Sequence, residues 1–91
     1  TWELMLCDVN LPGGSGLGLA REALARDPDL AVVMVTGDDY PQLAAAALEL
    51  GAYGFMVKPF RISELSVTVA GALRRRRLEI EIRSYREQRP G

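Results

Sequence analysis

Three polar residues that could act together on a phosphoryl group, Asp8, Thr36 and Lys58, each follow a short apolar run. Such runs are typical of buried strands; they lie at residues 4–7, 30–35 and 53–57. Because the carboxyl ends of parallel strands meet at one edge of a sheet, we expect a carboxylate, a hydroxyl and an ammonium to converge there. A carboxylate can attack phosphorus to form an acyl phosphate, and an ammonium and a hydroxyl compensate the charge of the new group. In the structural alternative, Asp8 and Thr36 cap loops and Lys58 pairs with Asp8.

Helical patterns separate the three predicted strands. Residues 17–25 place apolar side chains at helical spacing, and the alanine-rich run 44–47 has high helix propensity, with Gly51 suited to end that helix. A last helix is expected from about residue 64 to about residue 88, with Ser63 as its N-cap. The order is therefore β-α-β-α-β-α, which predicts a parallel sheet with right-handed crossovers.

The composition excludes several functional classes. The chain has 91 residues, 48% of them hydrophobic, and no histidine, so it cannot hold a Ser-His-Asp triad or an imidazole metal site of its own. We do not expect it to be an enzyme. It has one cysteine, which favours a reducing compartment, and no run long enough for a membrane span, so a cytoplasmic location without membrane contact is expected.

Short motifs, in this order and at these spacings, make the chain similar to the C-terminal portion of a response regulator receiver (CheY-like) domain. The similarity spans most of residues 4–73. The residues that carry it are Cys7-Asp8-Val9-Asn10-Leu11-Pro12, Gly16-Leu17, Val35-Thr36-Gly37, Gly51-Ala52 and Phe55-Met56-Val57-Lys58-Pro59-Phe60.

The resemblance implies a role for each residue at the strand ends. Asp8 would accept a phosphoryl group from a sensor histidine kinase or a phosphotransfer protein. Thr36 and Lys58 would hold the phosphoryl oxygens. The domain would then signal through its last strand and helices to a downstream output domain of the parent protein.

The resemblance also implies a magnesium ion and a conformational switch. Asp8 and the backbone carbonyl of Asn10 would be Mg²⁺ ligands, and Phe55 would occupy the aromatic switch position. The peptide bond between Lys58 and Pro59 would be cis, which is otherwise a minority state even before proline.

The sequence departs from the family pattern at its start. The family's first two strands and helices are absent, and with them the acidic pair that completes the Mg²⁺ site. We therefore expect a partial flavodoxin-like sheet, with a truncated receiver domain at residues 1–73 and a helical extension at residues 74–91. An alternative function is a non-phosphorylatable interaction or dimerisation fragment. The strand at residues 4–7 would become an apolar edge, so we expect a homo-oligomer or an element-swapped dimer to cover it.

The charge of the chain is divided unevenly. Residues 1–60 carry a net charge of −5 and residues 61–91 a net charge of +4. The run Arg74–Arg77 fans around its helix instead of forming one face, so nucleic-acid binding is not expected; Arg75–Glu79, Arg77–Glu81 and Glu79–Arg83 are spaced for ion pairs along the helix. Leu78, Ile82 and Tyr85 could form a seam that faces a partner. This stretch is also similar to linkers that precede HD-GYP phosphodiesterase domains.

Overall fold

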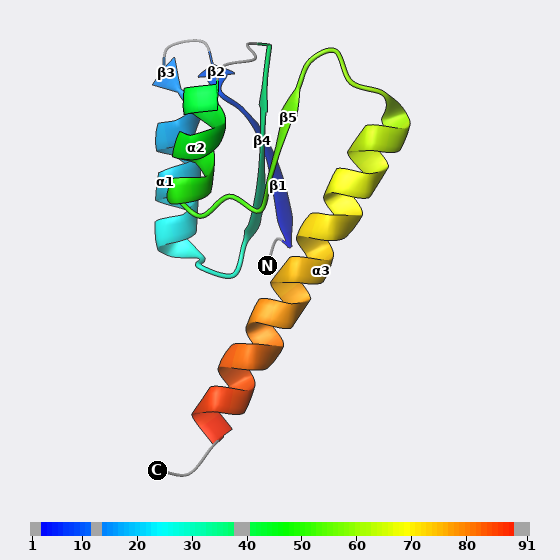
Figure 1. Cartoon of the computed structure of the whole chain (residues 1–91). Coiled ribbons are helices and arrows are strands. Elements are labelled where there is room, and N and C mark those ends of the chain that lie inside the picture. Colours follow the sequence, from blue (N-terminus) through cyan, green and yellow to red (C-terminus); the bar gives the residue numbers. More distant parts are fainter. Residues whose placement is uncertain (1–2, 12–13, 38–40, 89–91) are drawn as a thin grey trace.

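A computed structural model describes residues 3–11, 14–37 and 41–88 of the chain (Figure 1). The elements, in chain order, are β1 (Leu4–Asp8), β2 (Asn10–Leu11), β3 (Gly14–Ser15), α1 (Gly16–Arg26), β4 (Ala31–Thr36), α2 (Pro41–Glu49), β5 (Gly54–Val57) and α3 (Ile62–Gln88). The expected alternation of strands and helices is confirmed. The short β2–β3 ladder was not predicted, because strands of two residues carry no periodic pattern.

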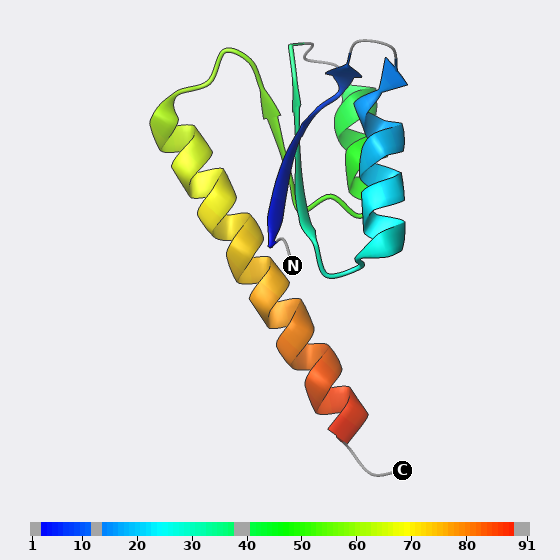
Figure 2. The same cartoon turned by 180° about the vertical axis from the view of Figure 1, so that it is seen from behind.

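The main sheet has the order β1-β4-β5, and both of its strand pairs are parallel. Helices α1 and α2 cover one face, and α3 crosses the other (Figures 1 and 2). Among the described residues, β1 lies at one edge of this sheet, as the sequence predicts, and the side chain of Leu6 is 48% exposed there. The structure is therefore the partial parallel α/β sheet that we expected.

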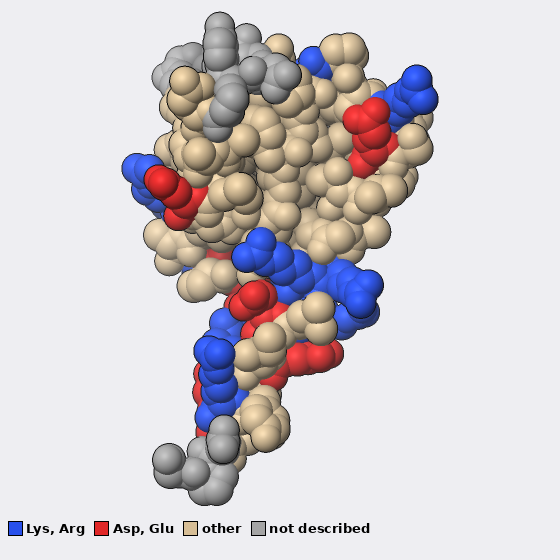
Figure 3. Space-filling model, viewed as in Figure 1, with Lys and Arg blue, Asp and Glu red and all other residues tan. Residues whose placement is uncertain are grey.

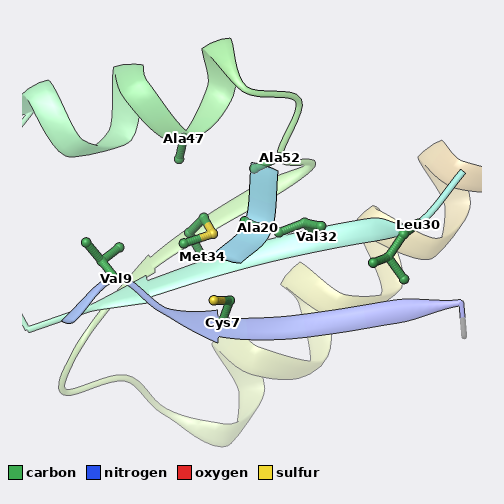
Figure 4. Close-up of a cluster of buried hydrophobic side chains, with 8 residues drawn as sticks. All are labelled: Cys7, Val9, Ala20, Leu30, Val32, Met34, Ala47 and Ala52. Atoms are coloured by element: carbon green, nitrogen blue, oxygen red, sulfur yellow. The ribbon is translucent and has the colours of Figure 1, made fainter. Parts of the chain in front are cut away.

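Strand β4 forms the centre of the core, because all six of its residues are buried. Successive side chains of a strand point to opposite faces. Val32 and Met34 join the cluster under α1 and α2 (Figure 4), whereas Ala31, Val33 and Val35 join the cluster under α3. A continuous apolar run was thus a correct signal for a strand that is covered on both faces.

Local signals set most of the helix ends. The hydroxyl of Ser15 accepts a hydrogen bond from the backbone N–H of Leu17 (3.2 Å) and caps α1. Gly51, which follows α2, has a φ of +109°, in agreement with its predicted role at the end of that helix. The prediction that Ser63 caps α3 is wrong. The helix begins at Ile62 because the N–H of Leu65 already donates to the carbonyl of Arg61 (3.1 Å).

Helix α3 has two parts with different surroundings. Its first half packs on the sheet through Leu65 and the buried Ala72, as the apolar stripe predicted. Its second half continues past the sheet (Figure 1) and exposes the apolar side chains of Leu78, Ile82 and Tyr85. The helix is unbroken across residue 73, and the division of the chain at that point stays a prediction. No helix within the described ranges is long and apolar enough to cross a membrane.

Candidate functional site

The three strand ends bring polar groups to one edge of the sheet. Asp8 is the last residue of β1, Thr36 the last of β4, and Lys58 directly follows β5. The ammonium of Lys58 donates to Oδ2 of Asp8 over 2.6 Å, and its backbone N–H donates to the carbonyl of Thr36 over 2.7 Å. The structure therefore places Lys58 in contact with both other residues, although it is 50 positions from Asp8 in the sequence.

Thr36 and its neighbour differ in their surroundings. The Thr36 side chain is fully buried, and each buried side-chain nitrogen or oxygen atom in the described part of the chain has a hydrogen-bond partner. Gly37 is exposed, and a Cβ atom placed on it would meet nothing within 4 Å. The strand end thus holds its hydroxyl in a fixed position next to open space.

The Asp8–Lys58 pair lies within reach of solvent, with 30% of the Asp8 side chain and 51% of the Lys58 side chain exposed. Ion pairs that are this exposed stabilise a fold by about 0–1 kcal/mol. The ion pair anticipated as the structural alternative is thus formed, but it contributes little to stability. A solvent-accessible ammonium next to an accessible carboxylate is also an arrangement that could bind a phosphoryl group.

Gly16 allows the start of α1 to pack closely against the site. Its place in the Gly16-Leu17 motif did not reveal this role. Its N–H donates to the carbonyl of Val9 (2.7 Å), and a Cβ atom at this position would lie 1.8 Å from the carbonyl oxygen of Asp8. The start of α1 therefore packs directly on the backbone of Asp8. Only a glycine allows this approach.

Cys7 lies beside Asp8 and faces the core. Its side chain is buried, and its thiol donates to the carbonyl of Gly16 (3.4 Å). Burial raises the pKa of the thiol, and the negative charge of Asp8 raises it further. The residue thus behaves as the small hydrophobic side chain that the sequence indicated.

We therefore expect Cys7 to resist alkylation in the folded chain. Because the thiolate is the reactive form, iodoacetamide at pH 8 should react at least ~10-fold more slowly with the native chain than with the urea-unfolded chain. Mass spectrometry over time measures both rates. Equal rates in the two states would show that Cys7 is accessible and would contradict this placement.

The structure also describes the other residues that the resemblance singled out. Asn10, two residues after Asp8, pairs with Ser15 in the β2–β3 ladder. Phe55 is half-buried and packs against the core cluster under α1 and α2. The bond between Lys58 and Pro59 is cis, as expected. The functional roles of Asn10 and Phe55 stay predictions.

The donor set for a magnesium ion is incomplete. In the part of the chain that the structure describes, no group of three or more histidine, cysteine, aspartate or glutamate side chains could hold a metal ion. Asp8 and the carbonyl of Asn10 supply too few anionic oxygens for a hard divalent cation. The described residues thus do not make a Mg²⁺ site on their own, and the contribution of an acidic pair from elsewhere stays a prediction.

Comparison with known proteins identifies the family. Residues 1–70 match the response regulator receiver domain. The chain belongs to this family. The receiver is 41% identical over 83 residues to the C4-dicarboxylate transport transcriptional regulatory protein DctD of Rhizobium meliloti, an alignment that covers 91% of this chain and 18% of DctD.

Solved structures agree with this assignment. The crystal structure of NtrX from Brucella abortus has a TM-score of 0.86 and 32% identity, covering 98% of this chain and 21% of NtrX. The beryllofluoride-activated NtrC4 receiver domain dimer has a TM-score of 0.77 and 28% identity, covering 82% of this chain and 62% of that one. The chain therefore spans part of a receiver domain and about a fifth of the length of the larger regulators.

Proposed function

We propose that this receiver accepts a phosphoryl group on Asp8 from a sensor histidine kinase or a phosphotransfer protein. The observation that carries the proposal is the contact of 2.6 Å between the Lys58 ammonium and the Asp8 carboxylate at the carboxyl edge of the sheet. Thr36 is held at the same edge by the parallel register of β4 and β5. The family, which the comparisons establish, supports these roles.

The proposed reaction needs no catalytic base from the chain. A carboxylate oxygen of Asp8 forms a bond to phosphorus while the bond between phosphorus and the imidazole nitrogen of the donor breaks. The electron pair of that bond stays on the nitrogen, which takes up a proton and leaves as neutral imidazole. Lys58 then moves its hydrogen bond from the carboxylate to the phosphoryl oxygens, and the Thr36 hydroxyl donates a second one. The chain acts here as an acceptor and a switch and not as an enzyme.

The rest of the pathway follows from the family as part of the proposal. Mg²⁺ would assist a complete receiver, with further carboxylates supplied from outside the described residues. Phe55 would turn inward when Thr36 moves toward the phosphoryl group. Strand β5 and helix α3 would then carry the signal to an output domain in the cytoplasm. DctD is named as a transcriptional regulatory protein. This favours an output domain that regulates transcription over the phosphodiesterase domain that the similarity of the linker suggested.

The acceptor role is tested by treating the chain with acetyl phosphate and Mg²⁺ and measuring its intact mass. We expect one phosphoryl adduct per chain, and its loss in Asp8→Asn, because the amide is not a nucleophile toward phosphorus. Asp29→Asn is the matched control, since it removes a carboxylate from the opposite edge of the sheet, and it should keep the adduct.

The absence of an adduct would favour the alternative function. If the unmodified chain forms no adduct while it remains folded by circular dichroism, it is a non-phosphorylatable interaction fragment. An adduct that persists in Asp8→Asn would place the acceptor elsewhere and would contradict the assignment of Asp8.

We also propose that the chain forms a homo-oligomer, through exchange or pairing of β1 or through α3. Two features support this: the exposed apolar side chains on β1 and the second half of α3, and the similarity to a receiver that is a dimer. Sedimentation of the chain at increasing concentration should reveal self-association, and a stable monomer at high concentration would contradict it.

A basic nucleic-acid surface has little support. Arg75 lies over the ring of Tyr53 (4.4 Å to its centre) and pairs with Glu79 (4.0 Å), so the predicted pair at this position is formed. In Figure 3, blue side chains gather on α3 just below the body of the domain, and blue and red side chains lie side by side further along the helix. We therefore propose that the extension is a connecting helix that does not bind nucleic acid.

A further inference from the structure

A second polar cluster lies at the amino ends of the strands, at the end of the sheet opposite to that of Asp8. Asp29, in the turn between α1 and β4, accepts two hydrogen bonds from the guanidinium of Arg83 on α3, at 2.5 and 2.8 Å. The Nε of Arg76, also on α3, donates to the backbone carbonyl of Asp29 (2.9 Å). Two arginines of one helix thus bind one residue of a distant turn.

The turn that carries Asp29 is itself fixed. The carboxylate of Asp27 accepts a hydrogen bond from the N–H of Asp29 (3.1 Å), and the carbonyl of Asp27 accepts one from the N–H of Leu30 (3.1 Å). Asp29 is therefore presented to α3 from a rigid position at the entrance to the central strand. The hydrogen bond from Arg83 also lowers the pKa of the Asp29 carboxyl.

The two arginines lie on the face of α3 that meets the body of the domain. Positions 76 and 83 are separated by about two helical turns, so they project in nearly the same direction. The exposed apolar side chains of Leu78, Ile82 and Tyr85 lie roughly a third to half a turn away around the axis. The contact with Asp29 therefore determines which side of the helix faces the body and which side faces outward.

We propose that Asp29, Arg76 and Arg83 form a clamp that fixes the direction and the rotation of the second half of α3. At its other end, α3 begins shortly after Lys58, near the opposite end of the sheet, and its first half packs on the sheet through Leu65 and Ala72. A bidentate pair of arginine and carboxylate restricts orientation more than a single hydrogen bond does. The clamp keeps the apolar stripe turned away from the body and available to a partner. It does not depend on the proposed phosphorylation.

Distances between spin labels test the clamp directly. With labels at Ala25→Cys and Ser84→Cys, in a background that carries Cys7→Ala, pulsed electron resonance should give one narrow distance distribution. Asp29→Asn and Arg83→Gln should each broaden this distribution and shift it to longer distances, because the helix is released from the turn. The matched control, Arg74→Gln, removes the same charge from the same helix and should leave the distribution unchanged.

A double-mutant cycle separates the clamp from a general effect of charge. In hydrogen exchange, amides 79–87 should exchange about three- to fivefold faster in either single variant. The double variant should show no further increase, since both changes break the same contact. An unchanged distance distribution, or additive effects of the two substitutions, would overturn the proposal.

Discussion

Replacing Gly16 with alanine is expected to destabilise the fold by about 3 kcal/mol or more, at the upper end of the range for overpacked sites. The added methyl group would lie 1.8 Å from the carbonyl oxygen and 2.7 Å from the carbonyl carbon of Asp8. Neither atom belongs to a flexible side chain, so α1 must move away from β1 to relieve the clash. A chain of this size has a small reserve of stability, and most of it would be lost.

Gly18→Ala is the matched control for this prediction. It lies in the same helix, but its Cβ atom would meet nothing within 4 Å. Alanine is a better helix former there, so we expect a gain of roughly 0.5–1 kcal/mol. Urea unfolding followed by circular dichroism measures both variants. If Gly16→Ala unfolds at the same urea concentration as the unmodified chain, the close packing of α1 on Asp8 is wrong.

Replacing Met34 with alanine is expected to lower the free energy of unfolding by about 2–5 kcal/mol. Met34 is fully buried in the central strand, between β1 and β5 and beneath α1 and α2. Its neighbours Val32 and Ala20 are also fully buried, so they cannot move in to fill the cavity without moving the backbone.

Met5→Ala removes the same atoms from the edge strand β1 and serves as the comparison. Met5 is only half-buried, so less apolar surface becomes exposed and solvent can enter the space; the expected loss is about 1 kcal/mol. Thermal or urea unfolding of the two variants under identical conditions gives the difference. Equal losses would mean that β4 is not the centre of the core.

The strands and their sequence along the chain could be predicted because their signals are local, whereas the edge position of β1 in the sheet followed from the family resemblance. The run before Thr36 is apolar on both faces, and it forms the buried central strand β4. The polar residue that follows each run marks the carboxyl end, so parallel pairing predicted that Asp8 and Lys58 lie at the same edge; their ion pair had been left open as an alternative. The β2–β3 ladder and the start of α3 at Ile62 were not predicted, since they depend on a few backbone hydrogen bonds.

Spacing along the helix did not predict the partner of Arg83. Helical spacing assigned it to Glu79, whereas in the structure it binds Asp29, 54 positions away, and lies 4.0 Å from Glu87. An exposed pair along a helix contributes only a few tenths of a kcal/mol, so a bidentate contact with a fixed turn competes well against it. The partner becomes available only after the turn before β4 has been placed beside α3.

The sequence by itself determined the family, the alternation of strands and helices, and the three residues at the carboxyl edge, because each depends on residue type and on spacing along the chain. The tertiary structure decided which backbone Gly16 touches and which carboxylate holds α3. Both contacts join segments whose separation in the sequence carries no periodic signal. They arise from the packing of α1 against β1 and of α3 across the sheet, which places these atoms within a few ångströms of one another.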